Sequence, residues 1–505
     1  MATPIPSPER PPTPARAPGP WRRAAAAIDR TPTVTLLAVL VAAHVALHAR
    51  WLAMPPAGFH LWRQTMTLSV ARNFHEEGFD LLRPRVDSRG ATPGITGMEF
   101  PLVNAAIGAA YRVVGFGDGV HRVVMLLLSL PALLGMMRLA RALLGTQTAG
   151  FLAGALLVTN PLFTYYAVSA LPEVPMLGAL LLGLADLVLW SRSLRTSCGV
   201  RGLALLTLAG LVKLSSAAAW PAVLLVLADG ARRATVRQRL VVGAAAAVGL
   251  AIVAGWYVWA RHLSAVYGNQ DFLLSPIFPF RRALVPVVLR RVFVRWLPEV
   301  YVSYPQFVLV LIGVVALWRT GGPAGHVLAA WTAGLVVYGA SMGPHLIMHD
   351  YYMAPATPML LLVATVGLER VAAAAETGRA PAWLAGALVV ATVIVGPYRG
   401  ISRLVGGKRG RDLAGLEARL QPFMPERDTL VVAASDPSPS IYLYFMHRKG
   451  WPVTDRVRPD DFAAMVRDGA RYLVSDSRGL ERRADVAPHL RFVGSSGRFF
   501  VFAIT

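Results

Sequence analysis

The chain has little charge for its length and almost no cysteine. Of its 505 residues 15% are charged and 55% are hydrophobic, whereas about a quarter of the residues in a soluble protein are charged. The single cysteine, Cys198, excludes an internal disulfide framework and a CxxC metal site. These shortages argue against a soluble enzyme and against a disordered scaffold.

Nucleotide-binding motifs are also missing. The sequence contains neither a GxxxxGK[ST] phosphate loop nor an HExxH motif. Its one glycine cluster, at residues 115–119, follows a helical pattern rather than a strand, so it predicts a turn. A nucleotide-driven pump and a nucleotide-cofactor enzyme are therefore disfavoured.

Acidic residues are scarce relative to basic ones. Fifty Lys and Arg against twenty-eight Asp and Glu give a formal net charge of +22. Such a balance is typical either of a nucleic-acid binder or of a membrane protein whose positive charges lie in its loops. Long apolar runs, such as residues 34–47 and 243–254, fit only the second class. We therefore expect a membrane partner and no nucleic acid.

Apolar segments long enough to cross about 30 Å of hydrocarbon recur along the chain. They predict a polytopic α-helical membrane protein with about eleven spans. The segments lie at about 33–54, 120–141, 147–165, 171–190, 200–214, 216–230, 239–260, 304–319, 326–343, 351–369 and 381–398. The first follows three arginines and is too long for a cleaved leader, so it predicts a retained signal anchor. Residues 1–30, rich in Pro, Ala and Arg at their start, are expected to form a disordered cytoplasmic tail.

The distribution of arginine predicts the orientation. With a cytoplasmic N-terminus, the inside loops carry most of the short-loop arginines, while the connections at 166–170 and 343–350 contain no Lys or Arg. An odd number of spans then places the C-terminus outside. The expected organisation is a core at 31–400 with a long first outside loop at 55–119, and a small α/β extracytoplasmic domain at 401–505. We expect a multi-pass protein of a bacterial inner membrane.

The outside segments are too long to be simple connections. Helical patterns near 61–77 and 99–114 predict interfacial helices on the membrane surface, and the arginine- and aromatic-rich stretch 261–303 predicts another. The last hundred residues predict strands at 429–434 and 472–475, helices at 440–447 and 460–468, and a hairpin of 491–494 with 498–503.

Polar residues that could carry chemistry gather in the first outside loop. A reaction that removes an acceptor proton while an anion leaves needs carboxylates and cations together. The loop offers both, and the alternative is a solvated loop whose charges pair with one another. The candidates there are Glu99, Asp87 and His60 for proton transfer, and Arg63 and Arg85 for an anion.

Further ionisable residues fall within or beside apolar spans. Lys213 and Glu173 are costly in a membrane, so they suggest function, with snorkelling to the interface as the alternative. His349-Asp350-Tyr351-Tyr352 begins the tenth span, where a helix N-terminus would also favour an anion. The alternative for that motif is an aromatic belt with a capping Asp.

Together these motifs resemble the GT-C superfamily of membrane glycosyltransferases, in the branch of protein O-mannosyltransferases and lipid A aminoarabinose transferases. The resemblance covers about residues 30–400. It is carried by Phe59-His60-Leu61-Trp62-Arg63-Gln64, Met98-Glu99-Phe100-Pro101-Leu102, Val120-His121-Arg122 and His349-Asp350-Tyr351-Tyr352, with support from Leu171-Pro172-Glu173 and Val212-Lys213.

The resemblance implies an inverting transfer of a hexose or pentose from a polyprenyl-phosphate donor to a lipid, glycan or protein acceptor on the outer face. A first-loop carboxylate would be the base, with Glu99 first, Asp87 second and His60 as a less favoured substitute. Relatives commonly place an acidic residue just after the first span, where this chain has His60. The carrier phosphate would be held by basic residues, with Tyr351 in the same motif and Glu173 orienting the sugar or acceptor. The expected phosphate ligands are Arg63, Arg85, Lys213 and His349.

No cofactor is required by these motifs, although Asp87, Glu99 and the histidines could bind a divalent cation. Two other functions remain open. A lipid or solute transporter would show internal repeats with broken spans in matching halves, and no such repeat is found. A non-catalytic scaffold for envelope assembly would use the C-terminal domain as its binding module.

Overall fold

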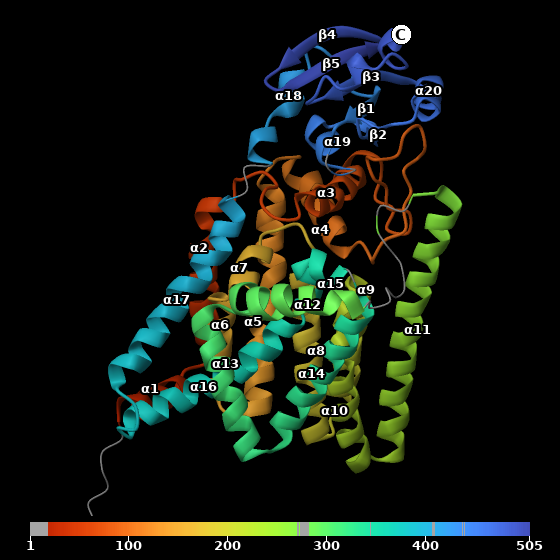
Figure 1. Ribbon diagram of the computed structural model, residues 1–505. Coiled ribbons are helices and arrows are strands. Elements are labelled where there is room, and N and C mark those ends of the chain that lie inside the picture. Colours follow the sequence, from red (N-terminus) through yellow and green to blue (C-terminus); the bar gives the residue numbers. More distant parts are fainter. Residues whose placement is uncertain are drawn as a thin grey trace, which may run out of the picture.

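The protein consists of a helical bundle with a small α/β domain on one end. The computed structural model describes residues 19–269, 272, 282–343, 345–406, 410–436, 438 and 440–505. In Figure 1 the long helices run roughly side by side, and the C-terminal domain covers the first outside loop at the top of the bundle. The expected fold class is confirmed. Residues 1–18 of the expected tail and Arg281 of the second outside segment lie outside the described residues.

Every segment expected to span the membrane is helical. Apolar runs of this length bury their backbone polar groups in helical hydrogen bonds, as a hydrocarbon environment requires. The helices of the bundle are α1 (Pro20–Arg30), α2 (Thr33–His48), α5 (Val120–Leu144), α6 (Gln147–Val158), α7 (Pro161–Tyr166), α8 (Glu173–Ser193), α9 (Thr196–Val212), α10 (Trp220–Arg233), α11 (Val236–Tyr267), α13 (Tyr304–Thr320), α14 (Pro323–Met342), α16 (Ala356–Glu376) and α17 (Ala382–Val405).

Several boundaries differ from expectation. Residues 20–30 form α1 instead of disordered tail, because Trp21 and the run Ala24–Ala27 favour a helix that packs beside α6. The expected third span is interrupted at Asn160, whose side chain accepts a hydrogen bond from the Phe163 N–H at 3.0 Å. Pro161 then begins α7, since a proline cannot continue the preceding helix.

The described residues contain seven helices that are long and apolar enough to cross a membrane. An eighth span is present if Arg282–Tyr301 and Tyr304–Thr320 are counted together, although they meet at an angle of 107°. Helices α6 and α9, expected as spans, are shorter apolar helices of 12 and 17 residues. The protein is a multi-pass membrane protein, and the count of eleven stays a prediction.

The first outside loop contains α3 (Leu61–Glu76) and α4 (Leu102–Val114). The prediction that α3 lies on the membrane surface is wrong, because thirteen of its sixteen residues are buried. Its apolar side chains, including Leu68 and Ala71, share a core with Tyr442 and Leu443 of the C-terminal domain. Helix α3 is therefore enclosed between the bundle and that domain, as Figure 1 shows.

The second outside segment supplies short helices: η3 (Arg282–Leu284), α12 (Val285–Val288) and the π-helix η4 (Leu289–Tyr301). Figure 1 shows α12 lying crosswise to the long helices. Large apolar side chains such as Leu289, Phe293 and Val294 are exposed on this segment. The exposed apolar face agrees with the expected interfacial position.

The C-terminal domain is a five-stranded mixed sheet in the order β2-β1-β3-β5-β4. Strand β1 pairs in parallel with β2 and β3, and β5 pairs in antiparallel fashion with β3 and β4. Strand β2 was not predicted, because Gly450 and Pro452 interrupt its pattern. The elements are α18 (Leu416–Leu420), β1 (Leu430–Ala434), α19 (Ile441–Met446), β2 (Lys449–Val453), α20 (Pro459–Arg467), β3 (Ala470–Ser475), β4 (Leu490–Ser496) and β5 (Phe499–Ile504).

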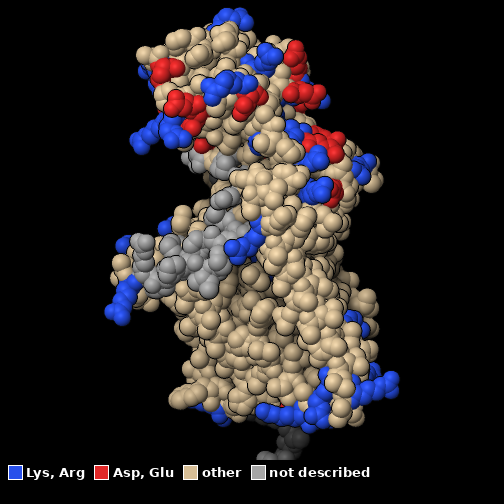
Figure 2. Space-filling view, turned by 90° about the vertical axis from the view of Figure 1, so that its right-hand side faces the viewer, with Lys and Arg blue, Asp and Glu red and all other residues tan. Residues whose placement is uncertain are grey.

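Charge is segregated along the long axis of the molecule. On the face shown in Figure 2, the broad middle of the bundle is uncharged, Lys and Arg gather at the lower end, and the C-terminal domain carries both signs. An uncharged middle band is what a lipid environment requires. The ionisable residues of interest are therefore those in the interior near the domain-covered end.

Candidate active site

The N-terminal end of α3 brings two candidate residues into the interior. His60 precedes the helix with a left-handed backbone (φ 52°, ψ 36°), and its carbonyl accepts hydrogen bonds from the amides of Arg63 and Gln64. Arg63 follows one turn later and is buried. Because residues three apart lie on the same side of a helix, His60 and Arg63 project into one region.

Arg63 and Lys213 form a charge cluster with Glu99 and Glu173. Arg63 Nη2 pairs with Glu99 Oε1. Lys213 Nζ lies 3.7 Å from Glu99 Oε1 and 3.2 Å from Glu173 Oε1. Four residues that are far apart in the sequence thus form one network, which we name the outer cluster.

Local structure explains how each member reaches the cluster. Glu173 is the first residue of α8, directly after Pro172, and Lys213 ends α9 with an extended backbone. The Phe100 N–H donates to the Leu211 carbonyl at 2.9 Å, which fixes the Glu99 loop beside the end of α9. The lysine and both carboxylates meet because a loop and two helix ends converge here.

The outer cluster favours ionised Glu99. Burial by itself would raise the pKa of Glu99, but the positive charges of Arg63 and Lys213 outweigh this effect and hold the pKa below its usual value. A carboxylate with a lowered pKa is a weaker proton acceptor. The pairing therefore weakens the case for Glu99 as the base.

Some polar atoms of the outer cluster have no hydrogen-bond partner among the described residues. They are Arg63 Nη1 and Glu173 Oε2, both of them buried, whereas Glu173 Oε1 is held in the ion pair with Lys213. Unpaired buried polar groups are costly and rare in folded proteins. These atoms leave unused hydrogen-bonding capacity for a ligand.

A second group of polar side chains surrounds Asp350, in the 3₁₀ turn η5 (Asp350–Met353). Its Oδ1 accepts hydrogen bonds from His60 Nε2 at 2.9 Å and from the Tyr166 hydroxyl at 2.5 Å. Its Oδ2 pairs with Arg403 of α17. Burial opposes the charge, yet Arg403 and His60 hold the pKa of Asp350 well below its usual value. Asp350 is therefore ionised.

Aromatic rings connect the two groups. The Tyr351 ring centre lies 4.8 Å from that of His60 and 5.6 Å from Lys213 Nζ. His349 stacks on Tyr351 with ring centres 5.2 Å apart. Burial and the neighbouring His60 lower the pKa of His349 to about 3, so it is neutral and cannot hold a phosphate by charge. Of the expected residues, His60, Arg63, Glu99, Glu173, Lys213, His349 and Tyr351 lie together.

Asp87 and Arg85 do not belong to this site. Asp87 is buried and pairs with Arg72, and its Oδ1 accepts from Asn73 Nδ2 at 3.1 Å. Arg72 also donates to the Tyr444 carbonyl at 2.9 Å. Asp87 thus helps attach the first loop to the C-terminal domain, and this pairing argues against it as the second candidate for the base.

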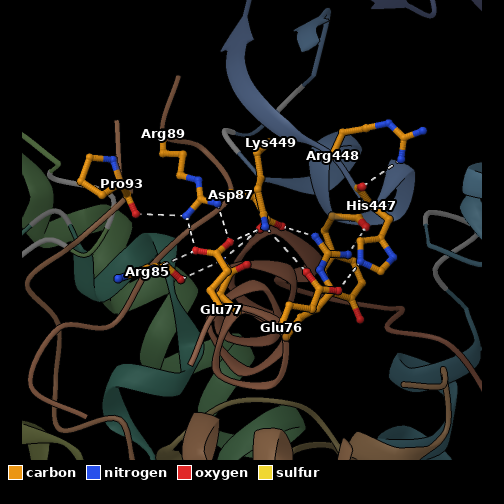
Figure 3. Close-up of polar contacts among 12 residues, drawn as sticks. Glu76, Glu77, Arg85, Asp87, Arg89, Pro93, His447, Arg448 and Lys449 are labelled. Atoms are coloured by element: carbon orange, nitrogen blue, oxygen red, sulfur yellow. Dashed lines mark hydrogen bonds and ion pairs between the residues drawn. The ribbon is translucent and has the colours of Figure 1, made fainter. Parts of the chain in front are cut away.

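Arg85 belongs to a network at the C-terminal end of α3, shown in Figure 3. Glu77 binds Arg85 at 3.2 Å and also Arg89 and Lys449, while Glu76 binds His447 and Lys449. A cavity of about 640 Å³ lies between the first loop and the domain, lined by these side chains. Hydrogen bonds from Arg89 and Lys449 outweigh burial and lower the pKa of Glu77 to about 2.

The donors in the outer cluster do not suit a divalent cation. Lys213 lies between Glu99 and Glu173 and so takes the place that a metal ion would occupy. Within the described ranges, no group of three or more His, Cys, Asp or Glu side chains has a metal-binding arrangement.

Three residues around His60 were not assigned to the site from the sequence. Asp350 was named only within a motif, and Tyr166 and Arg403 were not identified. Tyr166 follows the break at Asn160-Pro161, and Arg403 ends the last apolar helix. The break and the charged helix end were visible in the sequence, but their meeting with Asp350 required the fold.

The fold of the whole chain is similar to that of several solved membrane proteins. ArnT from Cupriavidus metallidurans matches with a TM-score of 0.63 in the apo state, at 16% identity over 93% of this chain and 97% of that one. The same protein bound to undecaprenyl phosphate gives 0.62. The oligosaccharyltransferase of Archaeoglobus fulgidus gives 0.56, at 10% identity over 92% of this chain and 72% of that one.

The chain has the GT-C fold. Arabinofuranosyltransferase AftD from Mycobacteria shares this fold, with a TM-score of 0.54 and 14% identity over 93% of this chain and 40% of that one. A family described as dolichyl-phosphate-mannose-protein mannosyltransferase matches residues 98–259. No curated protein sequence matches the chain. The GT-C resemblance seen in the motifs is thus confirmed at the level of the fold.

Proposed function

We propose that this protein is an inverting glycosyltransferase that moves a sugar from a polyprenyl-phosphate donor to an acceptor on the outer face of the membrane. The observation that carries the proposal is the pair of cations, buried Arg63 and half-buried Lys213, at the domain-covered end of a GT-C bundle. Two cations, with Arg63 Nη1 as a donor that has no hydrogen-bond partner among the described residues, suit a phosphate group.

The position of the outer cluster agrees with a lipid-linked donor. The polyprenyl chain of such a donor remains in the bilayer while its head group reaches the membrane surface, next to the ends of the spanning helices. ArnT of similar fold has been crystallised with undecaprenyl phosphate. We assign the carrier phosphate to Arg63 and Lys213, with Tyr351 beside them, and the orientation of the sugar or acceptor to Glu173.

Glu99 has a supporting role in this proposal. Its carboxylate contacts both cations, so it fixes their positions before the donor arrives. Its low proton affinity makes it a poor acceptor for the proton of the attacking hydroxyl.

The proposed orientation places the N-terminus in the cytoplasm and the C-terminal domain outside. Arginines concentrate at the helix ends opposite the domain, for example Arg192 in the last turn of α8, Arg195 just before α9, and Arg232 and Arg233 in the last turn of α10. An excess of Lys and Arg in short loops marks the cytoplasmic side.

The proposal is tested by a transfer assay on membranes that contain the full chain. Donors are radiolabelled sugars on polyprenyl phosphate, offered as a panel of hexoses and pentoses, with endogenous envelope acceptors. Arg63→Met should reduce transfer by about 100-fold or more, because one charge-assisted contact to the leaving phosphate is lost. Arg458→Met is the matched control, since Arg458 is exposed on the C-terminal domain and should leave transfer unchanged.

Other outcomes distinguish the remaining functions. Movement of the intact donor across sealed vesicles without sugar transfer would support a transporter. Absence of both transfer and transport with every donor would support a scaffold for envelope assembly. Equal transfer by Arg63→Met and Arg458→Met would contradict the assignment of the phosphate to Arg63.

A further inference from the structure

We infer that His60 is the general base of this site and that Asp350 positions it. The inference rests on the proposed glycosyl transfer and adds a residue pair to it. His60 Nε2 lies 2.9 Å from Asp350 Oδ1, and the same carboxylate is held by the Tyr166 hydroxyl and by Arg403. A histidine bonded to a buried, fixed carboxylate has the arrangement of a general base with its orienting group.

The hydrogen bond determines which ring nitrogen is free. Asp350 is ionised and accepts at Oδ1, so His60 Nε2 carries a proton, and in the neutral imidazole the lone pair then lies on Nδ1. Among the described residues, none hydrogen-bonds to Nδ1, and the His60 side chain is 13% exposed. The basic nitrogen is therefore available to a substrate hydroxyl.

The ring lies next to the proposed phosphate site. The Tyr351 ring contacts the His60 ring on one side. Lys213 Nζ lies 5.6 Å from the centre of the same Tyr351 ring. Arg63 is one helical turn from His60 along α3. A donor phosphate bound by Arg63 and Lys213 would thus leave its sugar within reach of an acceptor next to His60.

The left-handed backbone conformation at His60 is consistent with a functional role for its side chain. Its φ of 52° lies in the left-handed region, which is unfavourable for a residue that carries a Cβ. Glycine would occupy this conformation without strain. An imidazole at a position that glycine would occupy more easily agrees with a chemical task for the ring.

The acceptor oxygen forms a bond to the anomeric carbon while the bond from that carbon to the phosphate oxygen breaks. The acceptor proton passes to His60 Nδ1, and the bonding pair leaves with the polyprenyl phosphate, whose negative charge Arg63 and Lys213 receive. Attack opposite the leaving group inverts the anomeric centre.

Several titratable or charged groups surround His60 and belong to any pH profile. Asp350, His349 and Tyr351 face it from η5 and the residue before it. Tyr166 of α7 and Arg403 of α17 reach it through Asp350. If activity falls on acidification, the effect is assigned to His60 only when a substitution at residue 60 abolishes this pH dependence.

The test is chemical rescue of the full-length protein in membranes. His60→Gly should lower kcat by about 100-fold or more, and added imidazole should restore part of it in the space left by the ring. The rescued rate should follow the unprotonated fraction of imidazole as the pH changes. His60→Gln keeps an N–H donor for Asp350 but has no basic nitrogen, so it should be as impaired and should not be rescued.

Separate readouts distinguish the possible failures. Donor KM should stay within about threefold in both variants, because the phosphate ligands are unchanged. Wild-type kcat in His60→Gln, or no rescue of a folded His60→Gly, would overturn the inference while wild-type transfer still supports the proposed function. Absence of transfer by the wild type would instead contradict the proposed function. Asp350→Asn should lower kcat with little change in KM, as expected of a positioning residue.

Discussion

Two charge clusters of similar composition lie at opposite ends of α3, and they differ in their partners. At the N-terminal end, Arg63 joins Glu99, Lys213 and Glu173, which come from a loop and two helix ends of the bundle. At the other end, Glu76 and Glu77 bind side chains of the C-terminal domain (Figure 3). Nearby, Arg72 also bonds to a backbone carbonyl of that domain. The first cluster leaves atoms available to a ligand, and the second attaches one domain to the other.

The difference shows that charge in a loop does not by itself identify a site. Buried ion pairs can serve folding or chemistry, and the two roles predict different responses to mutation. Changes at the N-terminal end should reduce transfer, whereas changes at the C-terminal end should reduce the stability of the docked domain.

The largest effect is expected from Lys213→Met. It removes the cation shared by Glu99 and Glu173, so transfer should fall by more than about 100-fold. Glu173, which is buried, would also lose its ion-pair partner, which should cost about 3–5 kcal/mol of stability. Transfer assays and thermal unfolding in detergent measure both effects. Lys213→Arg, as the charge-preserving control, should retain stability, and wild-type transfer by Lys213→Met would contradict a role at the phosphate.

A loss of stability without loss of chemistry is expected from Asp87→Asn. It leaves the buried Arg72 guanidinium without a counter-charge, at a cost of about 3–5 kcal/mol. Limited proteolysis of the segment between α17 and the domain should become faster. The double variant Arg72→Met/Asp87→Leu removes both charges and should recover part of the loss. Transfer per folded molecule should match the wild type. A fall in kcat without a loss of stability would instead show that Asp87 takes part in catalysis.

Acid should weaken the C-terminal network through Glu77. Its pKa of about 2 lies below the usual value of 4.5. A group with a lowered pKa contributes stability that is present above pH 4.5 and is lost as the pH falls from 4.5 toward 2. Hydrogen exchange of the last turn of α3, corrected for intrinsic rates, should therefore increase over this range. Glu77→Gln should remove part of the dependence, and an unchanged dependence would mean that other groups produce it.

The smallest effect is expected from Arg85→Ala. Arg85 is about one-third exposed and shares Glu77 with Arg89 and Lys449, so its loss should cost about 1 kcal/mol or less. Transfer should be unaffected, although the sequence suggested this residue as a phosphate ligand. A rise in donor KM would show that the phosphate reaches the C-terminal network.

Local patterns were sufficient to predict the helices of the bundle and most of the C-terminal elements. Hydrophobic length predicted α5 and α8 closely, because burial in lipid depends on composition and length. Glu99, Lys213 and Glu173 were all named as site candidates because they lie in motifs that resemble those of a known superfamily. Asp87 was grouped with Glu99 because both lie in one loop, yet they pair with different residues on α3.

The remaining errors have physical causes. The prediction that α3 lies on the membrane surface was wrong because a domain more than 300 residues later in the sequence covers this helix. Strand β2 was missed because Gly450 and Pro452 weaken its pattern, whereas pairing with β1 stabilises it. The partners of Asp350 were missed because Tyr166 and Arg403 reach it from distant helices, which no local spacing reveals.

The length of α3 makes its two ends nearly independent. Arg63 and Glu76 are thirteen residues apart on this helix, a separation of about 20 Å at 1.5 Å per residue. At an effective dielectric constant of about 20, two unit charges that far apart interact by less than about 1 kcal/mol. A substitution at the C-terminal end of α3 can therefore alter the attachment of the outer domain while the electrostatic environment of Arg63 and Lys213 stays the same.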